Sequence, residues 1–486
     1  MFLWYNKRIE VIAVDEFLKE IYVAVFKKWL TFQKSEEYTI SEETSPEEAI
    51  VLTSDVTIGK IVFHDQCVME LSVTNKKTDQ IEYYLHFRMQ TLKHAVCLFR
   101  EMVSTMSTFN EQKTVKVLLS CTSGLTTGFF ADQLNTAAKA MHKDYSFEAV
   151  AYNELANVGT DYNIILLAPQ ISYQEARVRS IFDRTPVTTI PSIAFAKYDC
   201  DAVFKLIEKT LFEDESKKES VNLPGVLRLS INHPDQILAI GIIKTAHHVH
   251  LHYRVYEKQN ILTYGDIIKH AIALVDFNDI INMALMKCPH IKHVAIAAPG
   301  IMAGGHMTLL GHGFDHVDVV GYLKGLHPSL TFSLDNDVNT IVSGLYALQD
   351  NVDSLSFMFL PRGSYVGGVG SIYKGQLIKG LKNVAGEVQY MPIAYSDDPE
   401  KLGKSEEGSK EILAKTLAGV ISVLGPEEIA YYCSNVPCED ELYHAIKNYV
   451  PEEYIPPIKK IENLKEYILF GEMIQIIMRL ENAPKN

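Results

Sequence analysis

Apolar residues in the first 112 positions follow a helical period and then a strand period. From Val14 to Leu30 they recur every three or four positions, which predicts an amphipathic helix. We expect the apolar face of this helix to lie in the core; its residues are Phe17, Leu18, Ile21, Tyr22, Val25, Phe26 and Leu30. The next segments should be an acidic loop over 34–48, strands over 50–89 and a helix over 91–106. We interpret residues 1–112 as an α+β domain, and the pattern indicates no role for it.

Residues 113–222 alternate between short apolar runs and helical stripes. Such alternation predicts a parallel sheet with helices on both of its faces. The expected strands are 115–120, 147–151, 162–168 and 186–190. Three helices are expected: the first ends near residue 141, the second begins at 173, and the third spans 201–211. The charged stretch 213–225, which contains Pro224, is typical of a linker.

Residues 223–486 begin with strand-like runs and continue with alternating helices and strands. A chain of 486 residues exceeds what one hydrophobic core usually organises, so several domains are expected. We predict an α/β protein with three domains, at 1–112, 113–222 and 223–486.

Composition removes several classes of function. The chain is 47% hydrophobic and 22% charged, as folded globular proteins are. Its formal net charge of −14 disfavours nucleic acid, which we do not expect as a partner. Seven cysteines without CxxC spacing are typical of reduced thiols in the cytosol. We see neither a signal peptide nor an apolar run of the roughly 20 residues that span a membrane, so we expect a cytoplasmic protein.

Candidate chemistry begins at Cys121, between the predicted strand 115–120 and a helical stripe from about Phe129. A Gly-, Ser- and Thr-rich turn lets backbone N–H groups converge on an anion, and a helix N-terminus favours thiolate over thiol. The cradle would consist of Thr122, Ser123, Gly124, Leu125, Thr126, Thr127 and Gly128. An inert buried cysteine is the alternative for Cys121 taken alone.

Two nucleophilic mechanisms fit such a loop. A phosphatase would hydrolyse its cysteinyl phosphate, whereas a carrier would pass the phosphoryl group on. Phosphatases of this geometry need an Arg six residues after the Cys, and Thr127 stands there instead. The sequence therefore favours a carrier.

A second loop follows the strand predicted over 162–168. It contains Pro169, Gln170 and Tyr173, and loops at the C-terminal ends of parallel strands share one crevice. With this loop, residues from about Val115 to Leu211 resemble the enzyme IIB component of the lactose/cellobiose class of the bacterial sugar phosphotransferase system. The resemblance implies that Cys121 accepts phosphate from a phosphohistidine of enzyme IIA. In that family the phosphate then passes to a sugar bound in the membrane component.

Several motifs of the C-terminal half are similar to the ROK family of sugar kinases and sugar-responsive repressors, which have an actin-like two-lobed fold. They are Ala298-Pro299-Gly300, Leu334 to Asn339, and Gly367 to Gly370 followed by Val384 to Glu387. The resemblance places Asp337 at the catalytic base and Glu387 at a sugar-binding Glu, with Asn336 as a further candidate sugar ligand. Carboxylates suit both roles, because they accept strong hydrogen bonds and can take a proton. A vestigial cleft lined by helix-capping residues is an equal alternative.

Departures from the ROK pattern concern the nucleotide and the metal. The first phosphate hairpin reads Leu-Ser-Ile-Asn-His-Pro-Asp over 229–235 without the family's glycines, and the second loop is 362–365 with Arg362 and Tyr365. The late nucleotide turn is occupied by 431–434, and Tyr390 stands at the zinc-binding His. We predict neither ATP-dependent kinase activity nor structural zinc.

Histidines at 248, 250 and 252 would share one face of a strand. Three such histidines could bind a metal, but a solvated sheet face is the stronger interpretation, because no carboxylate or Cys recurs at ligand spacing. We predict no metal and no cofactor.

The leading hypothesis is a fusion of an enzyme IIB-like carrier with a ROK-like sugar-binding or scaffold domain. The resemblance implies an enzyme IIA phosphoprotein as partner, then a membrane permease (enzyme IIC) or a regulatory protein, and a sugar or sugar phosphate as ligand. It also implies that the ROK-like segment could form a homodimer. The alternatives are a non-enzymatic regulator switched by phosphorylation of Cys121 and, as the weakest, an active ROK-type kinase.

Overall fold

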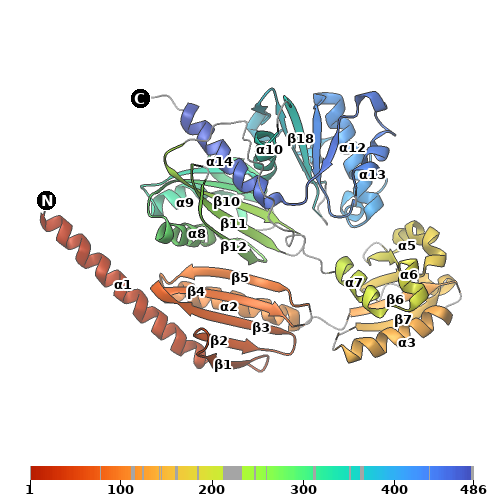
Figure 1. The fold of residues 1–486 in the computed structure, drawn as a ribbon, viewed down its shortest axis with the longest axis horizontal. Helices are drawn as coiled ribbons and strands as arrows, with labels where there is room; N and C mark the ends of the chain where they lie inside the picture. Colours follow the sequence, from red (N-terminus) through yellow and green to blue (C-terminus); the bar gives the residue numbers. More distant parts are fainter. Residues whose placement is uncertain are drawn as a thin grey trace. The chain divides into compact units, whose positions relative to one another are not determined.

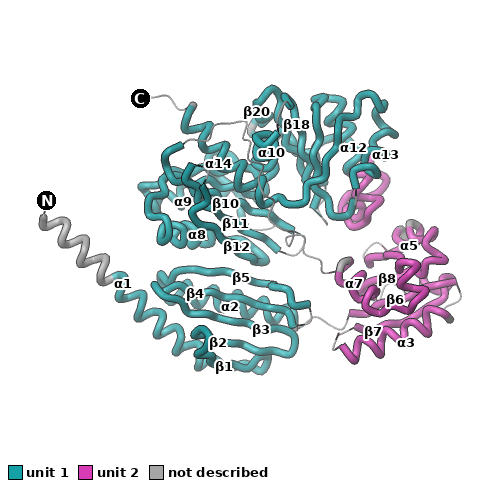
Figure 2. The backbone as a smooth tube through the Cα atoms, viewed as in Figure 1, with its two compact units in different colours: residues 1–111, 218–393, 413–486 teal, residues 112–217, 394–412 magenta. Residues whose placement is uncertain are grey.

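The computed structural model describes residues 2–482 apart from short gaps. These gaps are 77, 111–114, 123–124, 142, 144, 159–161, 183–184, 212–232, 246–247, 259, 310–312, 350–351, 362–365 and 437. The chain forms two compact units (Figure 2). Unit 1 comprises residues 1–111, 218–393 and 413–486, and unit 2 comprises residues 112–217 and 394–412.

The N-terminal part of unit 1 is an antiparallel meander with two helices, α1 (Phe2–Thr31) and α2 (Leu92–Asn110). Its strands are β1 (Thr39–Glu43), β2 (Ala49–Thr53), β3 (Thr57–His64), β4 (Val68–Asn75) and β5 (Ile81–Arg88). The stretch expected as a loop thus contains β1, whose polar residues suit a solvent-exposed edge strand.

Among the side chains of α1 that the structure describes, those of residues 15–31, only one face lies in the core. Phe26 and Leu30 are fully buried, but Phe17, at 60% exposed, and Val25, at 46%, point away from the packed face. Leu18 and Ile21 are also exposed. The expectation that the whole apolar stripe is core is therefore wrong, because a single helix face can contact the layer beneath it.

The meander continues into the sheet of the C-terminal segment. Strand β5 pairs antiparallel with β12 through Tyr84 and Ile268. The ten strands follow the order β1-β2-β3-β4-β5-β12-β11-β10-β13-β17 (Figure 1). The added strands are β10 (Gln236–Lys244), β11 (Val249–Glu257), β12 (Asn260–Lys269), β13 (Ile291–Ala298) and β17 (Thr331–Asn336). One hydrophobic cluster runs through both parts, from Phe26 to Phe277 and Leu323.

A second sheet repeats this strand pattern. Its order is β20-β19-β18-β21-β22, with two antiparallel pairings before β18 and two parallel ones after it, as in β12-β11-β10-β13-β17. The strands are β18 (Ser354–Phe359), β19 (Gly368–Tyr373), β20 (Gln376–Leu377), β21 (Glu428–Tyr432) and β22 (Ile458–Lys460). The duplicated topology is the two-lobed, actin-like arrangement that the sequence implied.

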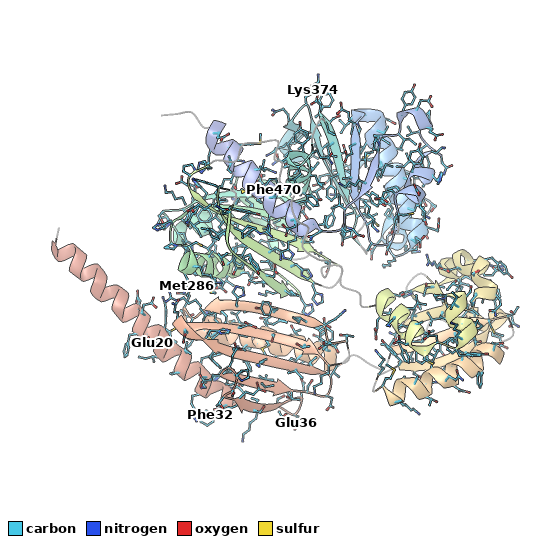
Figure 3. All side chains as sticks on the ribbon, viewed as in Figure 1. Glu20, Phe32, Glu36, Met286, Lys374 and Phe470 are labelled. Atoms are coloured by element: carbon cyan, nitrogen blue, oxygen red, sulfur yellow. The ribbon has the colours of Figure 1, made fainter. Side chains whose placement is uncertain are left out.

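Helices α10 (Asp337–Ala347) and α14 (Leu464–Asn482) pack closely beside these sheets. A Cβ added at Gly344 would lie 2.2 Å from the Tyr467 carbonyl oxygen, so the crossing requires glycine. Phe470 of α14, labelled in Figure 3, belongs to the apolar core formed with α10. The other helices of residues 274–446 are α8 (Leu274–Lys287), α9 (Val319–Leu326), α11 (Pro399–Leu402), α12 (Glu406–Leu424) and α13 (Glu439–Ile446). A small sheet contains β14 (Ile301–Ala303), β15 (His306–Leu309) and β16 (Phe314–Asp318).

Unit 2 contains the parallel sheet expected from its alternating pattern, which confirms the α/β class. The order is β7-β6-β8-β9, and all three pairings are parallel. The strands are β6 (Val115–Cys121), β7 (Tyr145–Ala151), β8 (Ile164–Leu167) and β9 (Val187–Thr189). The α-helices described between residues 112 and 217 are α3 (Leu125–Ala140), α4 (Leu155–Val158), α5 (Glu175–Ile181), α6 (Ser192–Lys197) and α7 (Cys200–Leu211). Apolar clusters on both faces of the sheet form the core.

The histidine row of β11 is buried, which corrects the prediction of a solvated face. His248, His250 and His252 are at most 7% exposed. His252 contacts Asp266 of β12 at 2.7 Å. Arg254, next on the same face, pairs with Glu466 of α14. Helix α14, distant in sequence, therefore contacts this face at Arg254.

None of the seven cysteines forms a disulfide. Within the described residues, every helix is too short or too polar to cross a bilayer.

Candidate functional site

Cys121 is the last residue of β6, an inner strand of the parallel sheet of unit 2. Strand β6 pairs with β7 on one side and β8 on the other, so the chain passes from β6 to β7 and then crosses to the opposite side of β6. Ligand sites of open parallel sheets lie at such a switch point, beyond the carboxyl ends of the strands. The thiol is 5% exposed, so it lies just beneath the surface of that edge.

Thr127 contacts the thiol directly. Its Oγ1 atom donates a hydrogen bond to the Sγ atom of Cys121 at 3.2 Å. Thr127 is fully buried and lies in the first turn of α3, whose N-terminus favours negative charge. The structure thus brings together a sulfur nucleophile, a hydroxyl donor and a helix end.

The other residues of the predicted cradle differ in placement. Thr122 and Thr126 are exposed, and Gly128 is partly buried within α3. Leu125 begins α3. Ser123 and Gly124 lie outside the described residues, so their predicted contacts stay predictions.

The second predicted loop starts beside the first. The Ala168 N–H group donates to the Ser120 carbonyl at 2.8 Å, which holds the end of β8 against the end of β6. A short helical segment then spans Pro169–Gln174. Gln170 is exposed, and Tyr173 is 76% exposed. Both loops therefore leave the same edge of the sheet, and the second presents its polar groups to solvent.

A second candidate site lies in the C-terminal part of unit 1. Its pocket is lined by Gly300, Asn336, Asn339, Asn383 and Glu387, among others. Asn336 caps α10 by accepting from the Asn339 N–H group, and its Nδ2 atom donates to the Gly300 carbonyl. The predicted residue Asn336 is thereby fixed at the pocket wall.

Asp337 is the first residue of α10 and only 4% exposed. Burial raises the pKa of Asp337 to about 7, the Val338 N–H group opposes this rise, and Glu387 adds to it. Burial likewise raises the pKa of Glu387. A carboxyl group that titrates near neutrality can donate as well as accept hydrogen bonds, which suits sugar hydroxyls.

Gly386 sets the position of Glu387. Its φ is +91°, and an added Cβ would lie 1.7 Å from the Val369 carbonyl oxygen, so only glycine fits. The Glu387 carboxylate accepts from Gln389 at 3.1 Å.

Sequence reasoning missed two amides of this pocket. The Asn339 Oδ1 atom is buried and has no hydrogen-bond partner among the described residues. Asn383 lines the pocket while its Nδ2 atom donates to the Met302 carbonyl. Asn339 stood inside the quoted motif, but only the fold shows that its oxygen is unpaired.

Two of the predicted departures in nucleotide contacts lie wholly or partly outside the described residues, at 229–232 and 362–365. Tyr431 and Tyr432 are described, and they end the buried strand β21. Tyr390 is 67% exposed.

Comparison with known proteins finds a family match in the middle of the chain. Residues 116–206 match the family model of the phosphotransferase system lactose/cellobiose-specific IIB subunit. The lactose-specific IIB component domain from Streptococcus pneumoniae is 23% identical and has a TM-score of 0.18. That match covers 20% of this chain and 97% of the domain.

The C-terminal half is similar to solved ROK structures. A ROK family protein from Streptococcus pneumoniae, solved with sucrose, is 17% identical, with a TM-score of 0.40, and the match covers 51% of this chain and 99% of that one. The ROK hexokinase from Thermus thermophilus is 11% identical, with a TM-score of 0.39, over 50% of this chain and 99% of that one.

Proposed function

We propose that unit 2 is a phosphoryl carrier of the sugar phosphotransferase system, in which Cys121 takes phosphate from a phosphohistidine of an enzyme IIA protein. The observation that carries this proposal is the position of the Cys121 thiol at the switch point of the sheet, beside Thr127 and the start of α3. The family match over residues 116–206 supports it independently.

The transfer proceeds by in-line attack of the Cys121 thiolate on the phosphorus of the phosphohistidine. An S–P bond forms while the N–P bond breaks, and the partner's imidazole leaves with the electron pair and is protonated from solvent. Thr127, which donates to Sγ, is placed to turn its hydroxyl toward the transferring group, and the helix end stabilises its negative charge. This chemistry requires no metal or cofactor on this chain.

Onward transfer needs a second acceptor. A sugar held by a membrane permease would receive the phosphoryl group and regenerate the thiol, in a cytosolic reaction. The exposed Gln170 and Tyr173 lie at the same sheet edge and would meet a partner there.

For the C-terminal part of unit 1 we propose a sugar-binding or scaffold role without kinase activity. The support is the pocket lined by Asn336, Asn339 and Glu387, whose polar groups suit hydroxyls. Asp337 does not line this pocket, but its buried carboxyl group interacts electrostatically with Glu387. Isothermal titration with cellobiose, chitobiose and their phosphates tests the ligand role, with Glu387→Gln as the matched variant. Absence of heat for all of these sugars would favour the scaffold.

Intact mass tests the carrier. The protein is incubated with phosphoenolpyruvate, enzyme I, the histidine carrier and a lactose/cellobiose-type enzyme IIA. We expect one added phosphate that disappears in Cys121→Ser and persists in Cys200→Ser, a partly buried thiol of the same unit. Failure with every enzyme IIA tried, in a protein that is folded, would overturn the carrier proposal.

A regulator is the second candidate. Unit 2 is inserted between segments that share one sheet, so phosphorylation of Cys121 could report sugar flux to unit 1. Restoration of sugar uptake in a strain lacking its own enzyme IIB would favour the carrier. A partner that binds only the phosphorylated form would favour the regulator, and an active ROK-type kinase stays the weakest alternative.

A further inference from the structure

Three side chains of metal-binding types meet at the start of β10 in unit 1. They are His233, Asp235 and His293, and one ligand atom of each lies within 4.8 Å of the other two. The Nε2 atom of His293 is 3.4 Å from the Oδ2 atom of Asp235. The rings of His233 and His293 are in edge contact, with centroids 5.5 Å apart.

The backbone fixes two of these residues. Asp235 directly precedes β10, and β10 pairs in parallel with β13, where Ile237 stands opposite His293. His233 precedes Pro234, which restricts its backbone to extended conformations. Its Nδ1 atom accepts from the Asp235 N–H group, so its Nε2 atom is the nitrogen left to a ligand.

A neighbouring hydroxyl orients the buried imidazole. His293 is 7% exposed, and its Nδ1 atom lies 2.5 Å from Thr331 Oγ1. Thr331 stands opposite His293 in the parallel pairing of β13 with β17. Metal-binding histidines commonly have their second ring nitrogen held in this way, which directs the first nitrogen at the ion.

We propose that His233, Asp235 and His293 bind one divalent transition-metal ion of the zinc class. Two imidazoles and one carboxylate suit zinc and its neighbours, and they leave a fourth position for water or a further ligand. Ligand atoms of a tetrahedral zinc site are about 3.3 Å apart, given bonds of about 2.0 Å, so the three side chains need only contract around the ion.

Lys292 competes with this ion. Its Nζ atom lies 2.5 Å from Asp235 Oδ1, although the side chain is 64% exposed. An entering cation would displace the ammonium group, which can turn into solvent at little cost. Lys292 therefore sets the affinity of the site without contributing a ligand.

Sequence spacing did not reveal this site, because His293 is remote from His233-Pro234-Asp235 in the chain. A bound ion would also fasten the segment that precedes β10 to the neighbouring strand. His233 is the first described residue after 212–232, so an ion would tie the chain to β13 where it enters the sheet of unit 1.

Calorimetric titration of Zn²⁺ into the full chain, made without a histidine tag and stripped with chelator, tests the proposal. We expect one saturable ion per chain, weakened at least tenfold by His233→Ala and by Asp235→Asn, and about tenfold by Thr331→Val. Lys292→Ala should bind more tightly. Substitution of the buried His293 would also disturb its packing, so the decisive variants are those of His233 and Asp235.

The matched control is the double variant His306→Ala/His316→Ala, which removes a different pair of histidines in ring contact, stacked rather than edge-on. It should leave the affinity unchanged. Cobalt(II) absorption in the visible range should report the same ligands with the same response to the variants. Lack of saturable binding, or binding that His233→Ala and Asp235→Asn leave intact, would overturn the site.

Discussion

The Thr127 hydroxyl donates a hydrogen bond to the Cys121 sulfur across the turn that joins β6 to α3. Both side chains are buried, so this donor has little competition from water. A thiolate or phosphorylated sulfur would accept it more strongly than a neutral thiol does.

We therefore expect Thr127→Val, which keeps the shape and removes the hydroxyl, to slow phosphorylation of Cys121 about tenfold. Quenched-flow transfer from phosphorylated enzyme IIA measures the rate. Thr136→Val, at an exposed position later in α3, should leave it unchanged. Equal rates for the two variants would show that the Thr127 hydroxyl does not assist transfer.

Asp337 should make unit 1 less stable as the pH rises. Its folded pKa is about 7 because of burial, whereas an unfolded Asp titrates near 3.9. Between these values the folded state holds more protons than the unfolded state, so the free energy of unfolding falls with increasing pH and is lowest above about pH 7.

Asp337→Asn should remove this pH dependence and stabilise the protein at pH 8, by on the order of 2 kcal/mol. Calorimetric unfolding at pH 5 and pH 8 measures it, with the exposed Asp315→Asn as control. A melting temperature whose pH dependence is the same in wild type and Asp337→Asn would contradict the burial argument.

The buried ion pair between Arg254 and Glu466 fastens α14 to β11. Two hydrogen bonds of 2.9 and 2.8 Å join the guanidinium to the carboxylate, and both side chains are 8% exposed. Glu466→Gln should lower the free energy of unfolding by about 3 kcal/mol, because it leaves a buried charge without its partner.

The double variant Arg254→Met/Glu466→Leu should recover most of this loss, since it removes both charges. Glu452→Gln, which breaks a surface pair with Lys447, should leave the melting temperature unchanged. A double variant as unstable as Glu466→Gln would indicate that packing, rather than charge, determines the loss.

We expect no hexose phosphorylation from ATP. The sequence over 229–235 lacks the glycines that would let backbone approach a triphosphate, and Tyr431 and Tyr432 end a buried strand where the resemblance places a nucleotide turn. Coupled measurement of ADP release with several hexoses tests this. Activity that Asp337→Asn abolishes would establish a kinase.

Local patterns were enough to predict the strand, loop and helix around Cys121. Strand β6, the thiol at its end and the loop after β8 depend on residues adjacent in sequence, and the parallel sheet follows from their alternation. Sequence motifs also pointed to Asn336, Asp337 and Glu387, of which Asn336 and Glu387 line the pocket of unit 1, while their role as sugar ligands stays a prediction.

Long-range contacts account for what the sequence did not indicate. The histidine row of β11 is buried, and the partners of its face come from other elements: Glu82 of β5 contacts His248, and Glu466 of α14 pairs with Arg254. The exposed side of α1 and the unpaired oxygen of Asn339 likewise depend on which neighbour lies opposite. Periodicity identifies an apolar face but not the element that will cover it.

The pairing of β5 with β12 has a consequence for the integrity of the chain. The segments on either side of unit 2 share one sheet and one apolar cluster, so their attachment to each other does not depend on the peptide that links them. A single protease cut between residues 212 and 232 would therefore yield two fragments that stay together as a nicked but intact unit 1.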